Sequence, residues 1–539
     1  MLLRLTFRSL SVLVAVLAAS VALTIGAQAQ RGAAGRGAAP TRGPITPHAY
    51  PLDDEHYLRW PLPAGEQAYG RIDGARVKRH VNEITAVSRK SRDDGNQYWG
   101  RISGTKYDDM VEAWVEGRFK ELGLQNVRRQ YFDLPPQWFP TKWQMTATGA
   151  GKTLTLATAR PAARSIATPA AGLDLDAVWV GLGTDADFAG RNVAGKAVVI
   201  YSIPAPSVIN HSANYLGAVR RAEEKGAAAV VVILGIPGNL SSELNSAAEK
   251  IPAFSLGLDD GTAVRDLLER GGAKVKMSLA VETRPGLRDA SVWGELPGTT
   301  DEDIIVMAHH DAYFEGALDN ASGMATMVGL AEYFSKVPKE QRRRTLKFVT
   351  TSGHHNGSLG VKWMHDNKET FLAKTALLLN CEHVSVTQTY YWGPNLRKSD
   401  TMDARRWWVY GSDKLADLAL NAYRTFGVAV YHEMEPNASG DMGQASLDAP
   451  SVQMIESPAF YHTDQDTPAV VPAAGLEAVT RAYAKLIDQV NKVDRAQLIG
   501  KPAATSSAAA NASARPTPDS RSAPAGQQWT RGAVRSPRR

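Results

Sequence analysis

The sequence predicts an α/β protein in which helices flank a mostly parallel, mixed sheet. Apolar runs of strand length alternate with longer helical segments between about residues 291 and 493, a pattern typical of parallel strands joined by helices. Six of the twelve histidines lie between residues 309 and 383, which indicates one site rather than scatter. Residues 138–283 show a similar alternation without such a cluster.

The C-terminal half is predicted to contain strands and helices in regular succession. Each predicted strand is a short apolar run, such as "EDIIVMA", and each predicted helix is a longer segment, amphipathic in the last case. We expect strands at 302–308, 345–351, 375–380 and 451–455, and helices at 321–337, 359–371, 412–426 and 475–493.

Residues with metal-binding or acid–base side chains follow the ends of three predicted strands. His309 and Asp311 follow the first strand, His354 and His355 the second, and Glu382 the third. Ligands of open α/β sheets collect at the carboxyl edge of the strands, so we expect these side chains to form one site. Imidazoles and carboxylates without a thiolate cluster favour zinc over manganese, cobalt or iron, and exclude an iron–sulfur site.

The first residues have the pattern of an export signal. Arg4 and Arg8 precede an apolar run that ends near Ala27-Gln28-Ala29, which has the spacing of a signal-peptidase site. We expect residues 1–29 to be a cleaved signal peptide and the protein to be periplasmic or secreted, without stable membrane insertion after cleavage. An uncleaved anchor is the alternative.

Composition predicts disordered ends and a folded centre. Residues 30–74 and 496–539 are expected to be a linker and a tail, because stretches rich in Gly, Ala, Ser, Pro and Arg bury little apolar surface. Residues 1–50 carry five arginines and no acid, and residues 501–539 carry seven basic residues against Asp519 alone, so residues 51–500 are mildly acidic and nucleic acid is not an expected partner. The only cysteine, Cys381, excludes an internal disulfide, so stability must come from the cores of two or three domains.

Two motifs resemble a known family. "AHHDAYFEGALDNASGMA" (308–325) and "FYHTDQDT" (460–467) resemble the signatures of co-catalytic zinc aminopeptidases and carboxypeptidases, which include bacterial leucyl aminopeptidases and glutamate carboxypeptidase II. "NCEH" (380–383) occupies the position of the family's third ligand. The resemblance extends over about residues 75–495.

The resemblance implies a domain division and a ligand set. Residues 75–137 and 284–495 would form a peptidase domain of the zinc exopeptidase fold, and residues 138–283 a smaller, inserted protease-associated domain that acts as a lid or docking element. Two Zn²⁺ ions per chain would lie on either side of one bridging carboxylate. Asp311 would hydrogen-bond the ring of His309. The implied metal ligands are His309, Asp319 (bridging), His355, Glu382 and His462.

One stretch departs from the family pattern. The family reads Glu-Glu-x-Gly-x-x-Gly where this chain has His354-His355 followed by "NGSLG". His355 therefore takes the position of a ligand and His354 that of the general base. With one carboxylate fewer, we expect the second metal to bind more weakly or to differ in kind. His354 either accepts a proton from water or ligates metal and blocks the water.

The predicted function is hydrolysis of terminal peptide bonds in peptides or proteins. Two alternatives remain: a catalytically silent homologue that binds peptides, and an acyltransferase of the glutaminyl-cyclase type, which uses one zinc and lacks the inserted domain. The sequence does not predict whether amino or carboxyl termini are removed, which side chains are preferred, or how many subunits assemble.

Overall fold

The computed structural model describes residue 57 and residues 59–202, 215–244, 248–392, 395–431, 438–445, 449–455 and 458–500. The expected signal peptide lies outside these residues. The folded chain begins before residue 75, because Tyr69 in η3 (Gln67–Arg71) and Ile72 are buried in the core. None of the described helices is both long and apolar enough to cross a bilayer.

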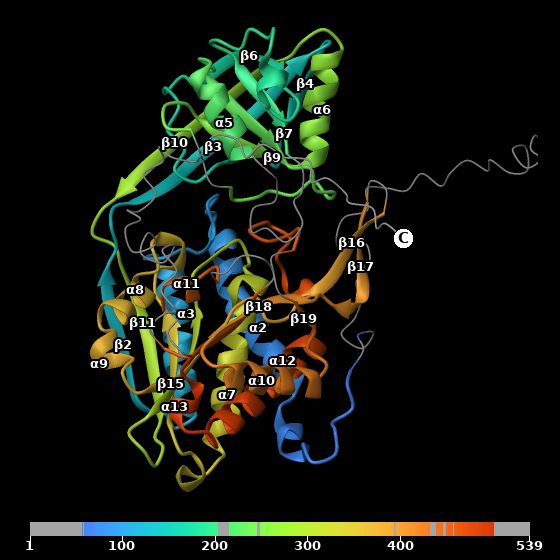
Figure 1. Cartoon of the computed structure of the whole chain (residues 1–539). Helices are drawn as coiled ribbons and strands as arrows, with labels where there is room; N and C mark the ends of the chain where they lie inside the picture. Colours follow the sequence, from blue (N-terminus) through green and yellow to red (C-terminus); the bar gives the residue numbers. More distant parts are fainter. Residues whose placement is uncertain are drawn as a thin grey trace, which may run out of the picture.

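A mixed sheet of eight strands forms the centre of the larger part of the molecule (Figure 1). Its strands are β2 (Gln125–Asp133), β11 (Arg288–Leu296), β12 (Asp303–His309), β14 (Thr345–Thr351), β15 (Thr375–Cys381), β18 (Arg405–Tyr410), β19 (Val430–Tyr431) and β20 (Ser451–Ile455). They run in the order β19-β18-β20-β15-β12-β14-β11-β2. The four central strands from β20 to β14 are parallel, and β11, β2 and β18 pair antiparallel. The predicted mostly parallel, mixed sheet is confirmed.

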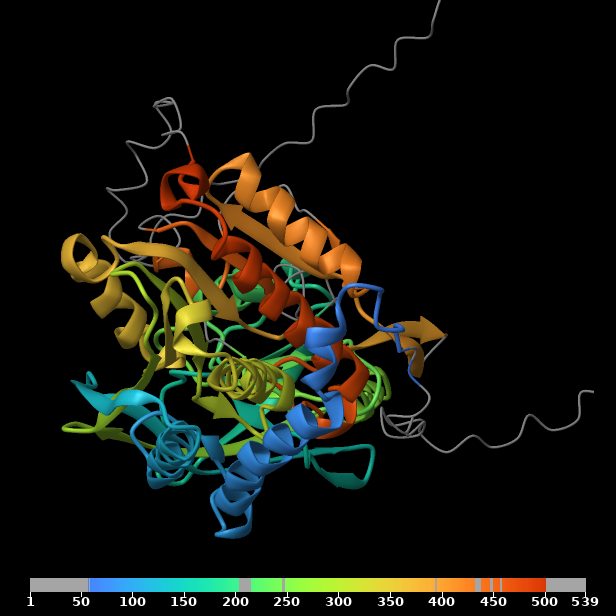
Figure 2. The ribbon, with the colours of Figure 1, turned by 90° about the horizontal axis from the view of Figure 1, so that it is seen from below.

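Helices cover both faces of this sheet because successive strand residues point to opposite sides. In β12, Ile304 and Val306 belong to one hydrophobic core, and Ile305 and Met307 to the other. The first core is covered by α2 (Gly74–Asp93), α3 (Lys106–Glu121), α7 (Gly323–Ser335), α10 (Asp413–Thr425) and α12 (Ala473–Val490). The second is covered by α8 (Leu359–Asp366), α9 (Lys368–Phe371) and α11 (Met442–Ala445). Figure 2 shows α2, α7 and α12 in blue, yellow and red, packed side by side.

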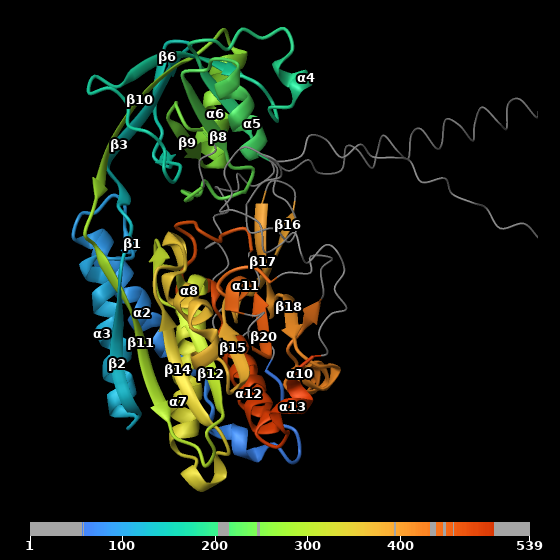
Figure 3. The same cartoon turned by 60° about the vertical axis from the view of Figure 1, so that its left-hand side comes forward.

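Residues 137–284 form a second sheet of eight strands above the first (Figures 1 and 3). It contains β3 (Gln137–Gly149), β4 (Lys152–Thr155), β5 (Arg160–Pro161), β6 (Leu173–Trp179), β7 (Ala197–Tyr201), β8 (Ala229–Ile233), β9 (Ala253–Leu256) and β10 (Lys274–Arg284). The strand and helix units expected here are present as β7, α5 (Tyr215–Glu224), β8, β9 and α6 (Leu258–Glu269). The long antiparallel pair β3 and β10, which leads into and out of this part, was not predicted.

Two predicted helices differ in their limits. The helix expected at 359–371 is interrupted at Asn367, where φ is −108° and ψ is 18°, so α8 and α9 are separate. The helix expected at 321–337 begins at Gly323, because Asp319 and Asn320 have non-helical backbone angles in the preceding turn, η4 (Ala317–Ser322). This irregular turn belongs to the site described next.

Candidate metal centre

The carboxyl ends of three adjacent parallel strands converge on one site. His309 is the last residue of β12, and Glu382 directly follows β15. His354 and His355 lie in the short helix η6 (His354–Asn356), which two residues separate from the end of β14. The neighbourhood expected from the sequence therefore exists, since β12 pairs with both β14 and β15.

The two signature motifs meet at the turn that holds Asp319. The Asp466 carboxylate accepts hydrogen bonds from the backbone N–H groups of Leu318 (2.6 Å) and Asp319 (3.1 Å). The Asn320 side chain donates to the carbonyl of Cys381 at the end of β15 (2.9 Å). Together these bonds fix the turn against the strand ends, and they turn the Asp319 side chain into the site.

Asp319 lies between two groups of imidazoles. Its Oδ1 is 3.1 Å from Nε2 of His309 and 3.1 Å from Nε2 of His383. Its Oδ2 is 2.9 Å from Nε2 of His462 and 3.6 Å from Nε2 of His355. All five side chains are largely buried. One carboxylate thus faces four ring nitrogens, as a bridging ligand does.

His383 joins the donors that were expected from the sequence. His309, Glu382 and His383 form one group whose donor atoms all lie within 4.8 Å of one another, and Asp319, His355 and His462 form a second. His383 follows Glu382 directly, within the stretch "NCEH" that marked the third strand end. Sequence reasoning missed it because no family position corresponds to it, although its place beside Glu382 was a usable signal.

The donors fit a pair of metal ions. Among the described residues, Nε2 of His309 and Oδ1 of Asp319 are buried and make no hydrogen bond, although only 3.1 Å separates them. The Nε2 atoms of His355 and His462 face each other at 3.2 Å. Bonds of about 2.1 Å from nitrogen and oxygen to a zinc ion place neighbouring ligand atoms at such separations. The set contains imidazoles and carboxylates and no thiolate, which suits zinc.

Asp311 holds His355 more directly than His309. Its Oδ2 accepts hydrogen bonds from the backbone N–H and from Nδ1 of His355, both at 3.0 Å, and from the Ser103 hydroxyl at 2.9 Å. The Nδ1 of His309 instead lies 3.2 Å from the Asp311 carbonyl oxygen, and 3.5 Å from the carboxylate. The Asp311 carboxylate therefore lies closer to the His355 ring than to the His309 ring, because the turn of η6 wraps around the Asp311 side chain.

His354 is paired with a carboxylate that the sequence did not reveal. Its Nδ1 lies 2.7 Å from Oδ1 of Asp441, and its ring stacks on that of His309 with 3.8 Å between centroids. Asp441 also accepts hydrogen bonds from the hydroxyls of Thr351 and Ser358. Asp441 follows no strand in the chain and belongs to neither motif. Nothing in the sequence therefore indicated its role.

The loop of Asp441 also approaches Glu382, one of the predicted metal ligands. A Cβ on Gly440 would lie 2.3 Å from Oε1 of Glu382, and the φ of Gly440 is +68°. Only glycine combines that backbone conformation with so close an approach. The loop therefore brings the Asp441 carboxylate near Glu382 as well as to His354.

The charges of these side chains depend on one another. Burial disfavours the ionised form of Asp319, but the histidines around it, first His383, outweigh burial and hold its pKa well below the usual range. Burial also opposes ionisation of Asp441, and the His354 imidazole reverses this, lowering the pKa of Asp441 to about 2. Conversely, burial disfavours the imidazolium of His354, yet Asp441 raises the pKa of that ring well above its usual value.

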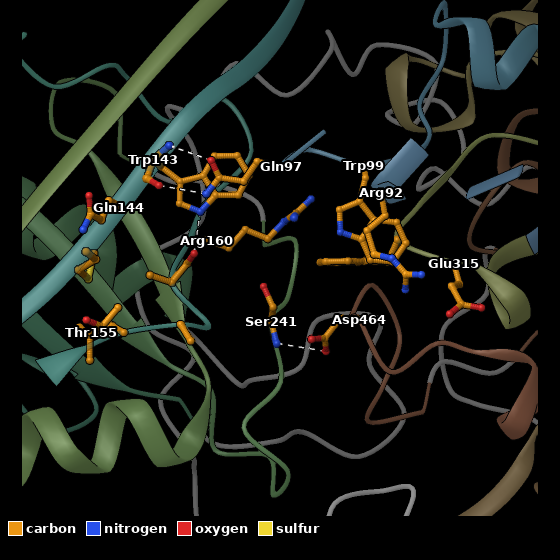
Figure 4. A pocket seen from close by; sticks show the side chains of 15 residues that line it. Arg92, Gln97, Trp99, Trp143, Gln144, Thr155, Arg160, Ser241, Glu315 and Asp464 are labelled. Carbon is orange, nitrogen blue, oxygen red and sulfur yellow. Dashed lines mark hydrogen bonds between the residues drawn. The ribbon is translucent and has the colours of Figure 1, made fainter. Parts of the chain in front are cut away.

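The segment expected as an inserted domain contacts the metal centre. The carbonyl of His462 accepts hydrogen bonds from the backbone N–H of Glu243 (2.9 Å) and the hydroxyl of Ser242 (3.2 Å). Figure 4 shows the adjoining cavity, of about 470 Å³, with Ser241 hydrogen-bonded to Asp464 between the two parts of the chain. The segment thus supplies backbone support to a predicted ligand, beyond the lid or docking role expected from the sequence.

Part of the chain is similar in sequence to known peptidases. Residues 291–487 match the model of Peptidase family M28. The chain is 24% identical over 351 residues to "Probable glutamate carboxypeptidase VP8" of Zea mays, a match that covers 52% of this chain and 48% of the maize protein, about half of its length. It is 23% identical over 380 residues to "Aminopeptidase YwaD" of Bacillus subtilis, covering 68% of this chain and 76% of that protein.

A solved structure has the same fold. The zinc aminopeptidase BSAP from Bacillus subtilis superimposes with a TM-score of 0.58 at 19% sequence identity, over 82% of this chain and 99% of that one. The matched region contains His309, Asp319, Glu382 and His462. Residues 291–487, which include most strands of the larger sheet and the side chains of the candidate metal centre, are thus similar to peptidase family M28.

Proposed function

We propose that this protein is a zinc-dependent exopeptidase that removes residues from the amino termini of peptides. The observation that supports this most directly is the pair of donor groups on either side of Asp319. The match to an aminopeptidase covers 68% of this chain and the match to a glutamate carboxypeptidase covers 52%, which favours amino-terminal over carboxyl-terminal cleavage. The donor sets suit two zinc ions, one bound by His309, Glu382 and His383, the other by His355 and His462, with Asp319 shared.

Zinc bound there would polarise a peptide carbonyl and make water more acidic. The other steps belong to the side chains. His354 is the general base in this proposal, with Nε2 as the atom that accepts a proton from the attacking water. Asp441 fixes the ring through Nδ1 and stabilises the imidazolium that forms. The same imidazolium can then protonate the departing amine.

Asp441 also compensates for negative charge that is missing because His354 and His355 stand where the family has two glutamates. Two carboxylates among the predicted ligands, Asp319 and Glu382, would face four positive charges. The buried Asp441 adds a third carboxylate behind His354. This arrangement favours an active enzyme over a catalytically silent homologue. With the Asp441 carboxylate bound to Nδ1, the Nε2 atom of His354 is suited to proton transfer. Export of the enzyme by residues 1–29 remains part of the proposal.

The first prediction tests the substrate. Aminoacyl p-nitroanilides should be hydrolysed, and their N-acetylated counterparts about 10–100-fold more slowly, the value of one hydrogen bond to a charged group. Release of p-nitroaniline by the full-length, zinc-supplemented protein measures both rates. Cleavage of N-blocked dipeptides that have a free carboxyl terminus, in preference to the unblocked substrates, would instead establish a carboxypeptidase.

The second prediction concerns bound metal. Asp319→Ala should lose about two zinc ions per chain relative to wild type, because its carboxylate lies between both donor groups. His462→Ala should lose about one, and His80→Gln, a buried histidine on α2 hydrogen-bonded to Glu332, should lose none. Elemental analysis of dialysed protein gives the counts. An unchanged count in folded Asp319→Ala would place the metals elsewhere.

The third prediction concerns the base. A base works when neutral, so the rate should rise as pH passes upward through the pKa of His354. Asp441→Asn removes the carboxylate that favours the imidazolium, so the pKa of His354 falls and this limb of the pH–rate profile moves to lower pH. His354→Ala should lower turnover by roughly 10²–10⁴-fold.

The matched control is Asp366→Asn, an exposed carboxylate on α8 that is paired with Lys362 and should leave the profile unchanged. Two results would contradict the assignment. One is an acid limb that stays in place in Asp441→Asn. The other is a nearly inactive wild type whose activity rises in His354→Glu, which would identify His354 as a ligand that blocks the water.

A further inference from the structure

A second cluster of titratable side chains lies behind the metal centre and is not used by the proposed reaction. Asp108 and Glu112 lie one turn apart on α3, so both face the same neighbour. Asp289 belongs to β11, and His310 follows His309 at the end of β12. The four side chains are buried, with exposed fractions of 0–2%. One helix and two strands thus place three carboxylates and an imidazole together inside the fold.

The distances within this cluster match those of the metal centre. Nε2 of His310 lies 3.2 Å from Oδ1 of Asp108, 3.2 Å from Oδ1 of Asp289 and 3.8 Å from Oε1 of Glu112. In the metal centre, Nε2 of His309 lies 3.1 Å and 3.9 Å from two carboxylate oxygens. One donor atom from each of the four residues lies within 4.8 Å of the others. The four donors thus surround a common point, as ligands of one ion do.

Hydrogen bonds within the cluster leave several buried atoms unsatisfied. Among the described residues, Oδ1 of Asp108 and Oδ2 of Asp289 have no hydrogen-bond partner, and neither has Nδ1 of His310. A proton on Nε2 of His310 satisfies Asp289, and Asp108 Oδ1 at the same distance remains without a bond. Buried carboxylate oxygens without a partner are costly. The oxygen of Asp108 therefore faces the His310 ring, which can donate its one Nε2 proton to only one of the two carboxylates at a time.

The three carboxylates of the cluster also carry more negative charge than the neighbouring arginines offset. Arg129 lies 3.0 Å from Glu112, but it also binds Asp109 and Glu116. Nearby Arg101 directs its N–H groups to the carbonyls of His310, Glu315 and Gly316 and to the Ser88 hydroxyl. A protonated His310 would give these three carboxylates one further positive charge, whereas a neutral His310, as a metal ligand must be, leaves them facing one shared guanidinium. A divalent cation would offset this buried negative charge.

We propose that Asp108, Glu112, Asp289 and His310 form a closed binding site for one divalent transition-metal ion, with Zn²⁺ as the best match. Four protein donors without an open position are typical of a structural site. Such an ion would tie α3 and β11 to the residue next to His309, and so hold the end of β12 in place. This site is separate from the co-catalytic pair and does not depend on the proposed peptidase activity.

Zinc counting in a background without the co-catalytic site tests the proposal. The full-length Asp319→Asn/His462→Gln variant, supplemented with zinc and dialysed, should retain about one zinc per chain. Adding Asp108→Asn and His310→Gln should remove that ion. The matched control adds Asp109→Asn instead, an exposed carboxylate on the same helix, and should keep the ion. Elemental analysis gives the counts, and circular dichroism shows which variants are folded.

A second measurement uses the wild-type protein, so it still tests the proposal if the variant with four substitutions does not fold. Crystals of the zinc-loaded wild-type protein should give an anomalous difference peak at the zinc edge between His310 and Asp108. Absence of this peak at full zinc loading would overturn the proposal. So would a folded Asp319→Asn/His462→Gln variant without zinc, or an ion that stays bound after the changes at Asp108 and His310.

Discussion

The structure of the site depends on one buried carboxylate at the edge of the sheet. Asp319 faces the ring nitrogens of His309, His355, His383 and His462, and its negative charge lies between the two groups of imidazoles. An isolated charge in such a place is costly unless cations or hydrogen-bond donors surround it. The neighbouring elements meet this demand, because Asp466 fixes the Asp319 turn, and His309, His355 and His383 come from or follow strand ends while His462 comes from a loop.

The pair of histidines in "TSGHHNGSLG" changes the chemistry of this site, but the candidate donor atoms still lie close together. His355 stays among the metal donors through its bond to Asp311, and His354 acquires a carboxylate of its own in Asp441. Asp441 therefore supplies a negative charge that the family's glutamates would have supplied, but it contacts His354 and not the predicted metal positions. Support for His462 comes from the backbone of Glu243, between β8 and β9, so the two parts of the chain build the site together.

Most of the candidate site could be predicted from the sequence because residues with metal-binding side chains directly follow predicted strands. His309, His355 and Glu382 follow buried apolar strands, and the parallel pairing of such strands brings their ends together. Asp441 could not be predicted, since it comes from a loop whose approach depends on tertiary packing alone. The antiparallel pairing of β3 and β10 could not be predicted for a similar reason. The two strands are over a hundred residues apart in the chain, and no local sequence pattern indicates such pairing.

The central claim is that one carboxylate joins two metal ions in a site built from nitrogen and oxygen donors. X-ray absorption spectroscopy at the zinc edge of the loaded wild-type protein tests it most directly. The account predicts a first shell of nitrogen and oxygen without sulfur, and a zinc–zinc vector of about 3.5–4 Å that disappears in Asp319→Ala. A spectrum of isolated ions at full loading, without that vector, would contradict it.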